Sequence, residues 1–106
     1  MHFHLPVVLT ALALLFTLAA APAMAVDARQ GEALAKRWCA ACHIVASDQT
    51  SGNAALPTFA SIAKRPGFTP VTLATFLRDP HPRMPDMALS RAETDDIAAY
   101  IATLAK

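Results

Sequence analysis

The 106-residue sequence carries almost no net charge and no cluster of basic residues. Nine Lys and Arg residues are balanced by eight Asp and Glu residues, which gives a formal net charge of +1. The basic residues are scattered along the chain, whereas proteins that bind nucleic acid usually gather them on one face or along one helix. The composition therefore argues against a nucleic-acid partner.

The chain also lacks the alternation of apolar and polar residues that is typical of β-strands, and it contains no internal repeat. Apolar residues instead recur at helical spacing between breaks that contain proline or glycine. We therefore expect an all-α fold of three to four short helices.

One long apolar run is present, from Leu5 to Ala21, and it is followed by Ala23-Met24-Ala25. An apolar run that ends in a small-x-small site is typical of a secretory signal peptide. We expect residues 1–25 to be this signal and residues 26–106 to form the mature, periplasmic domain, without stable membrane insertion after cleavage. No Lys or Arg precedes the run, so an uncleaved membrane anchor is the alternative.

The expected mature domain is short of material for a large apolar core. Domains of about 80 residues usually need a disulfide, a metal or another staple. The chain has two cysteines, Cys39 and Cys42, three positions apart.

Start and stop signals in the sequence indicate where these helices lie. Asp27 can cap the first helix, Thr69 with Pro70 can begin the third, and Ser90 with Glu93 forms a capping box for the last. Residues 47–57 are rich in turn formers, and prolines stiffen residues 79–89. The helices are therefore expected at residues 28–39, 59–64 and 70–78, and from residue 91 to near the C-terminus.

The segment Cys39-Ala40-Ala41-Cys42-His43 matches C-x-x-C-H, the sequence at which haem is attached covalently. On a helical turn the two thiols lie on one face, where they can reach two vinyl groups of a porphyrin. His43 then points its imidazole at the iron. We expect one haem c, bound through Cys39 and Cys42 and ligated by His43, and its apolar plane would supply the missing core.

Three other interpretations of the cysteine pair are weaker. A disulfide between Cys39 and Cys42 would close a very short loop and constrain the unfolded chain little. A thioredoxin-like redox pair needs a βαβ context, which this sequence lacks. A zinc site needs four well-placed ligands, and the adjacent Cys42 and His43 are hard to aim at one tetrahedral ion.

With this motif in place, the mature chain resembles class I c-type cytochromes over nearly its whole length. Gly31 matches the glycine that lets the first helix cross closely against the last, and Ile97 and Tyr100 match the positions that meet it. The resemblance implies a cytochrome c fold, with short helices packed round one covalently attached haem. Ala35 stands where the family often has an aromatic residue, so we expect Leu34 and Trp38 to pack the crossing.

The resemblance also implies residues around the iron. Pro57 matches the proline whose carbonyl accepts a hydrogen bond from the ligating imidazole, although Leu56 replaces the glycine that often precedes it. Met84, immediately before Pro85, matches the sixth ligand.

Two other residues compete with Met84 for the sixth position. Met87 lies in the same loop and is otherwise interpreted as a core residue. His81 would give a lower reduction potential than a methionine, and its flanking prolines indicate an exposed loop position.

The resulting hypothesis is that the protein is a one-electron carrier and not an enzyme. It would exchange electrons with redox proteins or with a larger dehydrogenase or oxidase subunit. One alternative is the haem subunit of a periplasmic dehydrogenase complex. Another is a gas-binding or peroxidatic haem protein whose sixth position is open.

Overall fold

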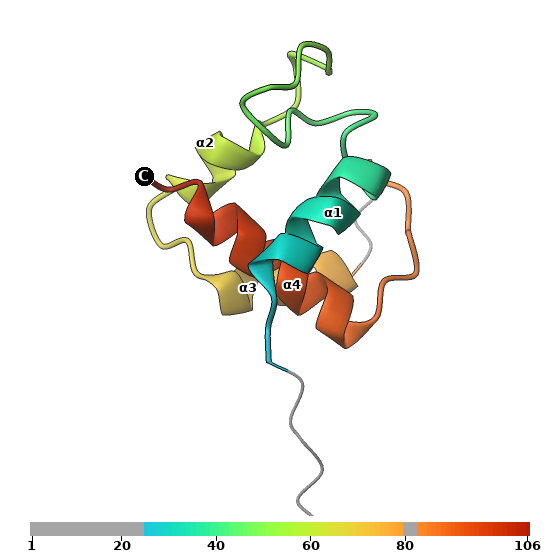
Figure 1. The fold of residues 1–106 in the computed structure, drawn as a ribbon, viewed down its shortest axis with the longest axis vertical. Coiled ribbons are helices and arrows are strands. Elements are labelled where there is room, and N and C mark those ends of the chain that lie inside the picture. The colour runs from blue at the N-terminus through green and yellow to red at the C-terminus, as the bar shows by residue number, and fades with distance from the viewer. Residues whose placement is uncertain (1–24, 80–82) are drawn as a thin grey trace, which may run out of the picture.

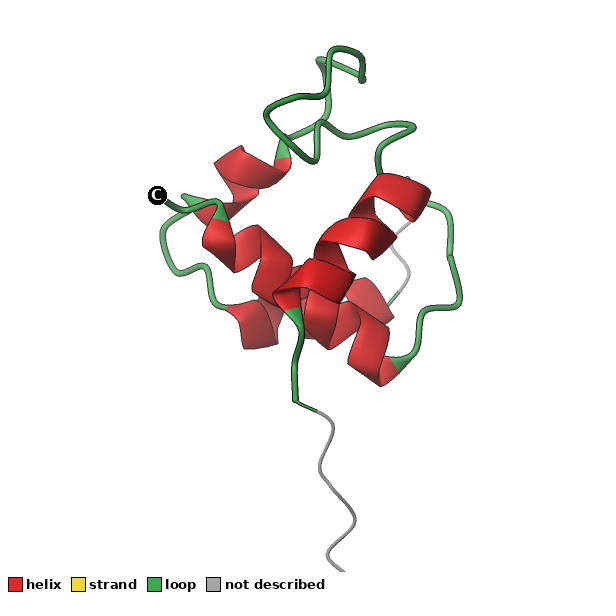
Figure 2. Ribbon diagram, viewed as in Figure 1, coloured by secondary structure: helices red, strands yellow, loops and turns green. Residues whose placement is uncertain are grey.

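A computed structural model describes residues 25–79 and 83–106, which form four α-helices joined by loops (Figure 1). The helices are α1 (Ala28–Trp38), α2 (Phe59–Ala63), α3 (Pro70–Arg78) and α4 (Arg91–Thr103). These two described segments contain no β-strand, which confirms the all-α prediction (Figure 2). Most of the expected signal segment and His81 lie outside the described residues.

The helices begin where the sequence predicts, because side chains cap their first turns. The Asp27 carboxylate accepts the N–H groups of Arg29 and Gln30 at 2.9 and 3.3 Å. Thr69 and Ser90 begin α3 and α4 with capping boxes, in which each side chain pairs reciprocally with the residue three positions later. Local chemistry thus sets the start of these elements.

Helices α1 and α4 cross with their backbones in contact at Gly31 (Figure 1). A Cβ atom at Gly31 would lie 2.9 Å from the backbone nitrogen of Ile97 and closer still to the carbonyl of Asp96. The Asp96 side chain also accepts the Asp27 N–H at 2.8 Å. The predicted glycine crossing is therefore confirmed.

A small core surrounds this crossing. Tyr100 and Ile97 of α4 are buried as expected, and so is Leu34 of α1. Trp38 is not: the expectation that it packs the crossing is wrong, because its side chain is 39 % exposed. Ala35, fully buried, fills the crossing, and the Arg37 guanidinium lies 4.8 Å from the centre of the Trp38 rings.

Helix α3 is tied to α4 by a polar contact as well as by packing. Arg78 donates from Nε to the hydroxyl of Thr94 at 3.1 Å and forms an ion pair with Asp95. This contact holds α3 beside α4. The core cluster is formed by Leu34, Ala35, Val45, Phe59, Ala63, Ile97, Tyr100 and Ile101.

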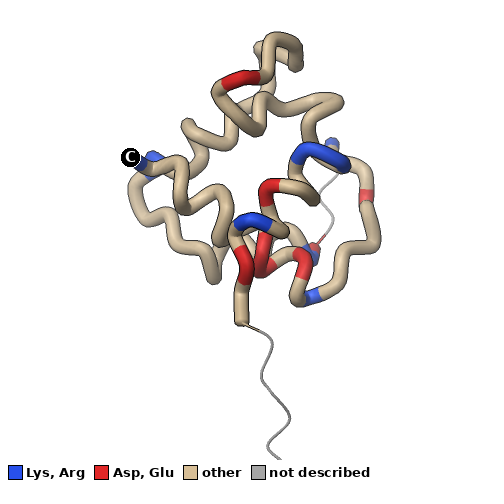
Figure 3. Tube along the Cα trace, in the orientation of Figure 1, with Lys and Arg blue, Asp and Glu red and all other residues tan. Residues whose placement is uncertain are grey.

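Charged residues of both signs lie along the helices (Figure 3). Lys36 and Arg37 occupy the last turn of α1, where positive charge complements the helix dipole. Glu93 lies in the first turn of α4, where negative charge is favourable for the same reason. In the described part of the chain, no helix has both the length and the apolar character needed to cross a bilayer.

Candidate functional site

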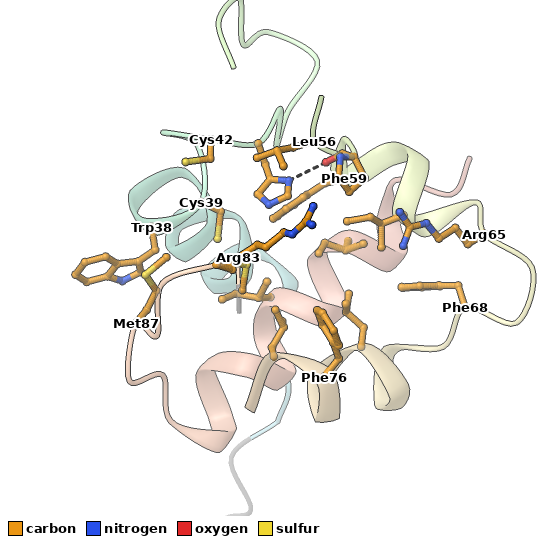
Figure 4. A pocket seen from close by; sticks show the side chains of 18 of the residues that line it. Trp38, Cys39, Cys42, Leu56, Phe59, Arg65, Phe68, Phe76, Arg83 and Met87 are labelled. Atoms are coloured by element: carbon orange, nitrogen blue, oxygen red, sulfur yellow. Dashed lines mark hydrogen bonds between the residues drawn. The ribbon is translucent and has the colours of Figure 1, made fainter. Parts of the chain in front are cut away.

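A cavity of about 600 Å³ opens between the end of α1, the helices α2, α3 and α4, and the loop before α4 (Figure 4). Apolar and aromatic side chains form most of its wall, among them Phe59, Leu73 and Ile97. Its volume falls in the range of about 300–1,000 Å³ that is usual for cofactor pockets. The predicted site residues Cys39, Cys42, His43, Met84 and Met87 all line it.

The cysteine motif continues α1 beyond its last residue. The backbone N–H groups of Cys42 and His43 both donate to the carbonyl of Cys39, at 3.2 and 2.9 Å. This turn brings both cysteines to the cavity wall, where Cys39 is half-buried and Cys42 is exposed (Figure 4). The two thiols are free and form no disulfide.

The environment of Cys39 bears on the redox-pair interpretation. Burial raises the pKa of the Cys39 thiol to about 11, because desolvation disfavours the thiolate. Cysteines of redox pairs have lowered pKa values that keep a reactive thiolate at neutral pH. The buried environment of Cys39 therefore does not match that of a redox-active thiolate.

His43 is held in one orientation by two contacts. Its Nδ1–H donates to the carbonyl of Pro57 at 2.7 Å, drawn as the dashed line in Figure 4. Its ring lies 5.6 Å from the Phe59 ring, centre to centre, at a tilt of 46°. The predicted bond to Pro57 is thus confirmed, and it leaves Nε2 as the nitrogen available for a metal.

The loop between α3 and α4 brings two thioethers to the cavity. Met84 and Met87 are both half-buried and both belong to its wall. Figure 4 shows Met87 on the side of the cavity where Trp38 lies. Between them, Asp86 accepts the N–H of Ala88 at 2.8 Å, and Ala88 adopts a positive φ of 52°. The competing His81 falls outside the described residues.

The charged side chains of the cavity wall are cationic. Arg65 and Arg83 line it, and no carboxylate belongs to the lining among residues 25–79 and 83–106. Figure 4 shows the Arg83 side chain extending into the cavity. Two cations in an apolar wall suit an apolar group that carries carboxylates.

These residues fit a haem. The two cysteines on one turn match its vinyl groups, and the oriented imidazole and the thioethers of the other loop match its iron. The apolar walls match the porphyrin plane, and the two guanidinium groups match the propionates. A zinc site is not supported, because the described residues contain no cluster of three or more His, Cys, Asp or Glu side chains placed to hold a metal ion.

Two side chains support the site through contacts that were not predicted from the sequence. Gln49, in the predicted polar loop, forms hydrogen bonds through its amide to four backbone groups around the motif. Tyr100, predicted at the helix crossing, also donates its hydroxyl to the carbonyl of Val45 at 2.6 Å. Neither contact has a signal in the local sequence, because each depends on how the loop folds back.

Comparison with known proteins agrees with this geometry. Residues 26–101 match the family described as "Cytochrome C oxidase, cbb3-type, subunit III". Cytochrome c-552 of Bradyrhizobium diazoefficiens (strain USDA 110) is 51 % identical over 104 residues, which cover 98 % of this chain and 98 % of that protein. No solved structure matches the chain.

Proposed function

The chain belongs to this family of c-type cytochromes, and on that basis we propose that it is a periplasmic one-electron carrier whose haem iron is bound by His43 and Met84. Membership of the family makes it a haem c protein and an electron carrier rather than an enzyme. The periplasmic location, the two ligands of the iron and the action as a separate carrier protein are parts of the proposal. The observation that carries the proposal is the His43 imidazole, oriented by Pro57 beside the two cysteines.

Each part of the site has a distinct task in this proposal. Cys39 and Cys42 would hold the haem through thioether bonds, and His43 would bind the iron through Nε2. When bound, haem supplies an iron that alternates between ferrous and ferric states and so carries one electron. The apolar walls exclude water, and Arg65 and Arg83 would balance the propionate charges.

The sixth ligand is assigned to Met84. It precedes Pro85 in the pattern of class I c-type cytochromes, and it lines the cavity. A thioether ligand favours ferrous iron and raises the reduction potential relative to a second imidazole. Met87 then serves as a packing residue in the same wall.

A matched pair of variants tests this assignment. The spectrum of the oxidised wild-type protein should contain the weak band that arises from sulfur-to-iron charge transfer. Met84→Ala should abolish the band, and Met87→Ala, which alters the same loop, should keep it. The reverse pattern would transfer the ligand to Met87. A wild-type spectrum with five-coordinate iron would instead favour a gas-binding or peroxidatic protein.

The exported location is proposed from the N-terminal sequence. Residues 1–25 carry the apolar run and the small-x-small site of a signal peptide. Mass spectrometry of the haem protein from a periplasmic fraction should give a mature chain that begins at Val26. An intact N-terminus in a membrane fraction would favour the membrane anchor.

The carrier is proposed to work as a separate protein. In support, the relative named as a cytochrome has nearly the same length as this chain. The family description names an oxidase subunit. The alternative is therefore that the protein is a permanent subunit of a larger complex. Purification under mild conditions separates the two: a free carrier elutes alone, whereas a subunit elutes with a larger cofactor-bearing protein.

A further inference from the structure

The side chain of Gln49 forms hydrogen bonds at the centre of the loop that follows the cysteine motif. Its Nε2 donates to the carbonyls of Ala40, His43 and Ser51, at 3.0, 2.7 and 2.7 Å. Its Oε1 accepts the N–H of Val45 at 2.9 Å. One half-buried amide, with two donor hydrogens and one acceptor oxygen, thus contacts four backbone groups.

These contacts involve backbone groups both before and after His43 in the sequence. Ala40 lies between the two cysteines, and Val45 lies two residues after His43. Helix α1 ends at Trp38, so the carbonyls of Ala40 and His43 have no donor from the helix and need one elsewhere. Gln49 supplies both of those donors from a single side chain.

The neighbouring carbonyls are held by other parts of the fold. The carbonyl of Cys42 accepts the Asn53 N–H at 2.9 Å, and that of Ile44 accepts the Phe59 N–H at 3.0 Å. With Gln49 at His43 and the Tyr100 hydroxyl at Val45, every carbonyl from residue 42 to residue 45 has a donor. Gln49 is the side chain that acts on the His43 carbonyl itself.

We propose that Gln49 is a positioning residue for His43. The ring is held at one end by the bond from Nδ1 to Pro57 and at the other by its own backbone. By fixing that backbone on both sides, Gln49 keeps Nδ1 in reach of the Pro57 carbonyl and Nε2 directed at the iron. The inference rests on the proposed ligation of the iron by His43. It adds a supporting residue that lies six positions further along the chain.

The mechanism is geometric, because the amide is neutral and adds no charge near the haem. Gln49→Glu keeps the shape and the acceptor for Val45 but directs a carboxylate at three carbonyl oxygens. Gln49→Met has a similar length and forms none of the four bonds. Thr69→Ala removes the N-cap of α3, outside the cavity wall, and serves as a control for general loss of stability.

The test measures solvent exchange of the His43 Nδ1 proton by NMR in the ferrous haem protein, at one pH and temperature. Loss of the amide donors should make opening of the His43–Pro57 bond easier and speed this exchange about tenfold in both Gln49 variants. In Thr69→Ala the exchange rate should stay at the wild-type value, although the midpoint of unfolding falls.

Two outcomes would overturn the proposal, and they differ. A wild-type exchange rate in Gln49→Glu and Gln49→Met would show that Gln49 only stabilises its loop. A wild-type protein in which His43 does not bind the iron would overturn the ligation and this proposal together. If Gln49→Met gives no folded haem protein, Gln49→Glu decides the question, since it retains the bond to Val45.

Discussion

The Tyr100 hydroxyl donates to the backbone carbonyl of Val45 at 2.6 Å, and both residues are buried. This bond joins the last helix to the segment that carries His43, across 55 positions of sequence. It therefore ties the helix that crosses α1 at Gly31 to the backbone two residues after His43.

Tyr100→Phe removes only the hydroxyl of this pair. The Val45 carbonyl would then be buried without its donor, which costs about 1–3 kcal/mol of the free energy of unfolding. Denaturant unfolding of the haem protein should detect the loss, while the haem stays covalently attached. An unchanged unfolding midpoint would contradict this role for the hydroxyl.

The same residue predicts a pH dependence. Burial raises the pKa of Tyr100, since desolvation disfavours the phenolate. The stability that this shift represents is complete below the pKa of an unfolded tyrosine, about 10, and is lost as the pH rises through the folded pKa. The stability difference between wild type and Tyr100→Phe should thus shrink above pH 10, as alkaline unfolding curves of both proteins can show. A stability difference that stays constant above pH 10 would contradict this pH dependence.

Gly31→Ala should separate α1 from α4. Its new methyl group would overlap the Asp96 carbonyl, so the helices must move apart, at a cost of about 1–3 kcal/mol that the better helix propensity of alanine does not offset. Thermal unfolding measures the loss. Ala33→Ser, on the exposed face of the same helix, is the control and should change the midpoint little.

Cys39→Ala combined with Cys42→Ala should abolish covalent haem attachment. Haem staining of a denaturing gel tests this, because a thioether-bound haem migrates with the polypeptide. Retention of haem on the double variant would disprove attachment at these residues. The double variant should also fold poorly, since the apolar cavity of about 600 Å³ would lose the group that fills it.

Features set by neighbouring residues could be predicted from the sequence. The caps at Asp27, Thr69 and Ser90 define helix starts because each acts within its own first turn. The turn at Cys39 follows from the spacing of the motif. These features need no knowledge of the rest of the chain.

Features that depend on distant contacts were predicted only where a family resemblance supplied them. Gly31 and Pro57 were identified in this way, and the structure confirms the contacts of both. Gln49 lies in a loop of turn formers, so its four bonds could not be read from the pattern. The expectation for Trp38 was wrong because the sequence does not show that the small side chain of Ala35 is enough to fill the crossing.

The fluorescence of Trp38, which is partly exposed and adjacent to the cysteine motif, can be used to measure haem attachment. Trp38 is the single tryptophan of the chain and directly precedes Cys39. A porphyrin joined to Cys39 would quench the emission of the adjacent indole by energy transfer, and the short stretch of chain would keep the two close even after unfolding. Fluorescence of the protein in denaturant should therefore measure the fraction of polypeptides that lack attached haem, rather than the fraction that has unfolded.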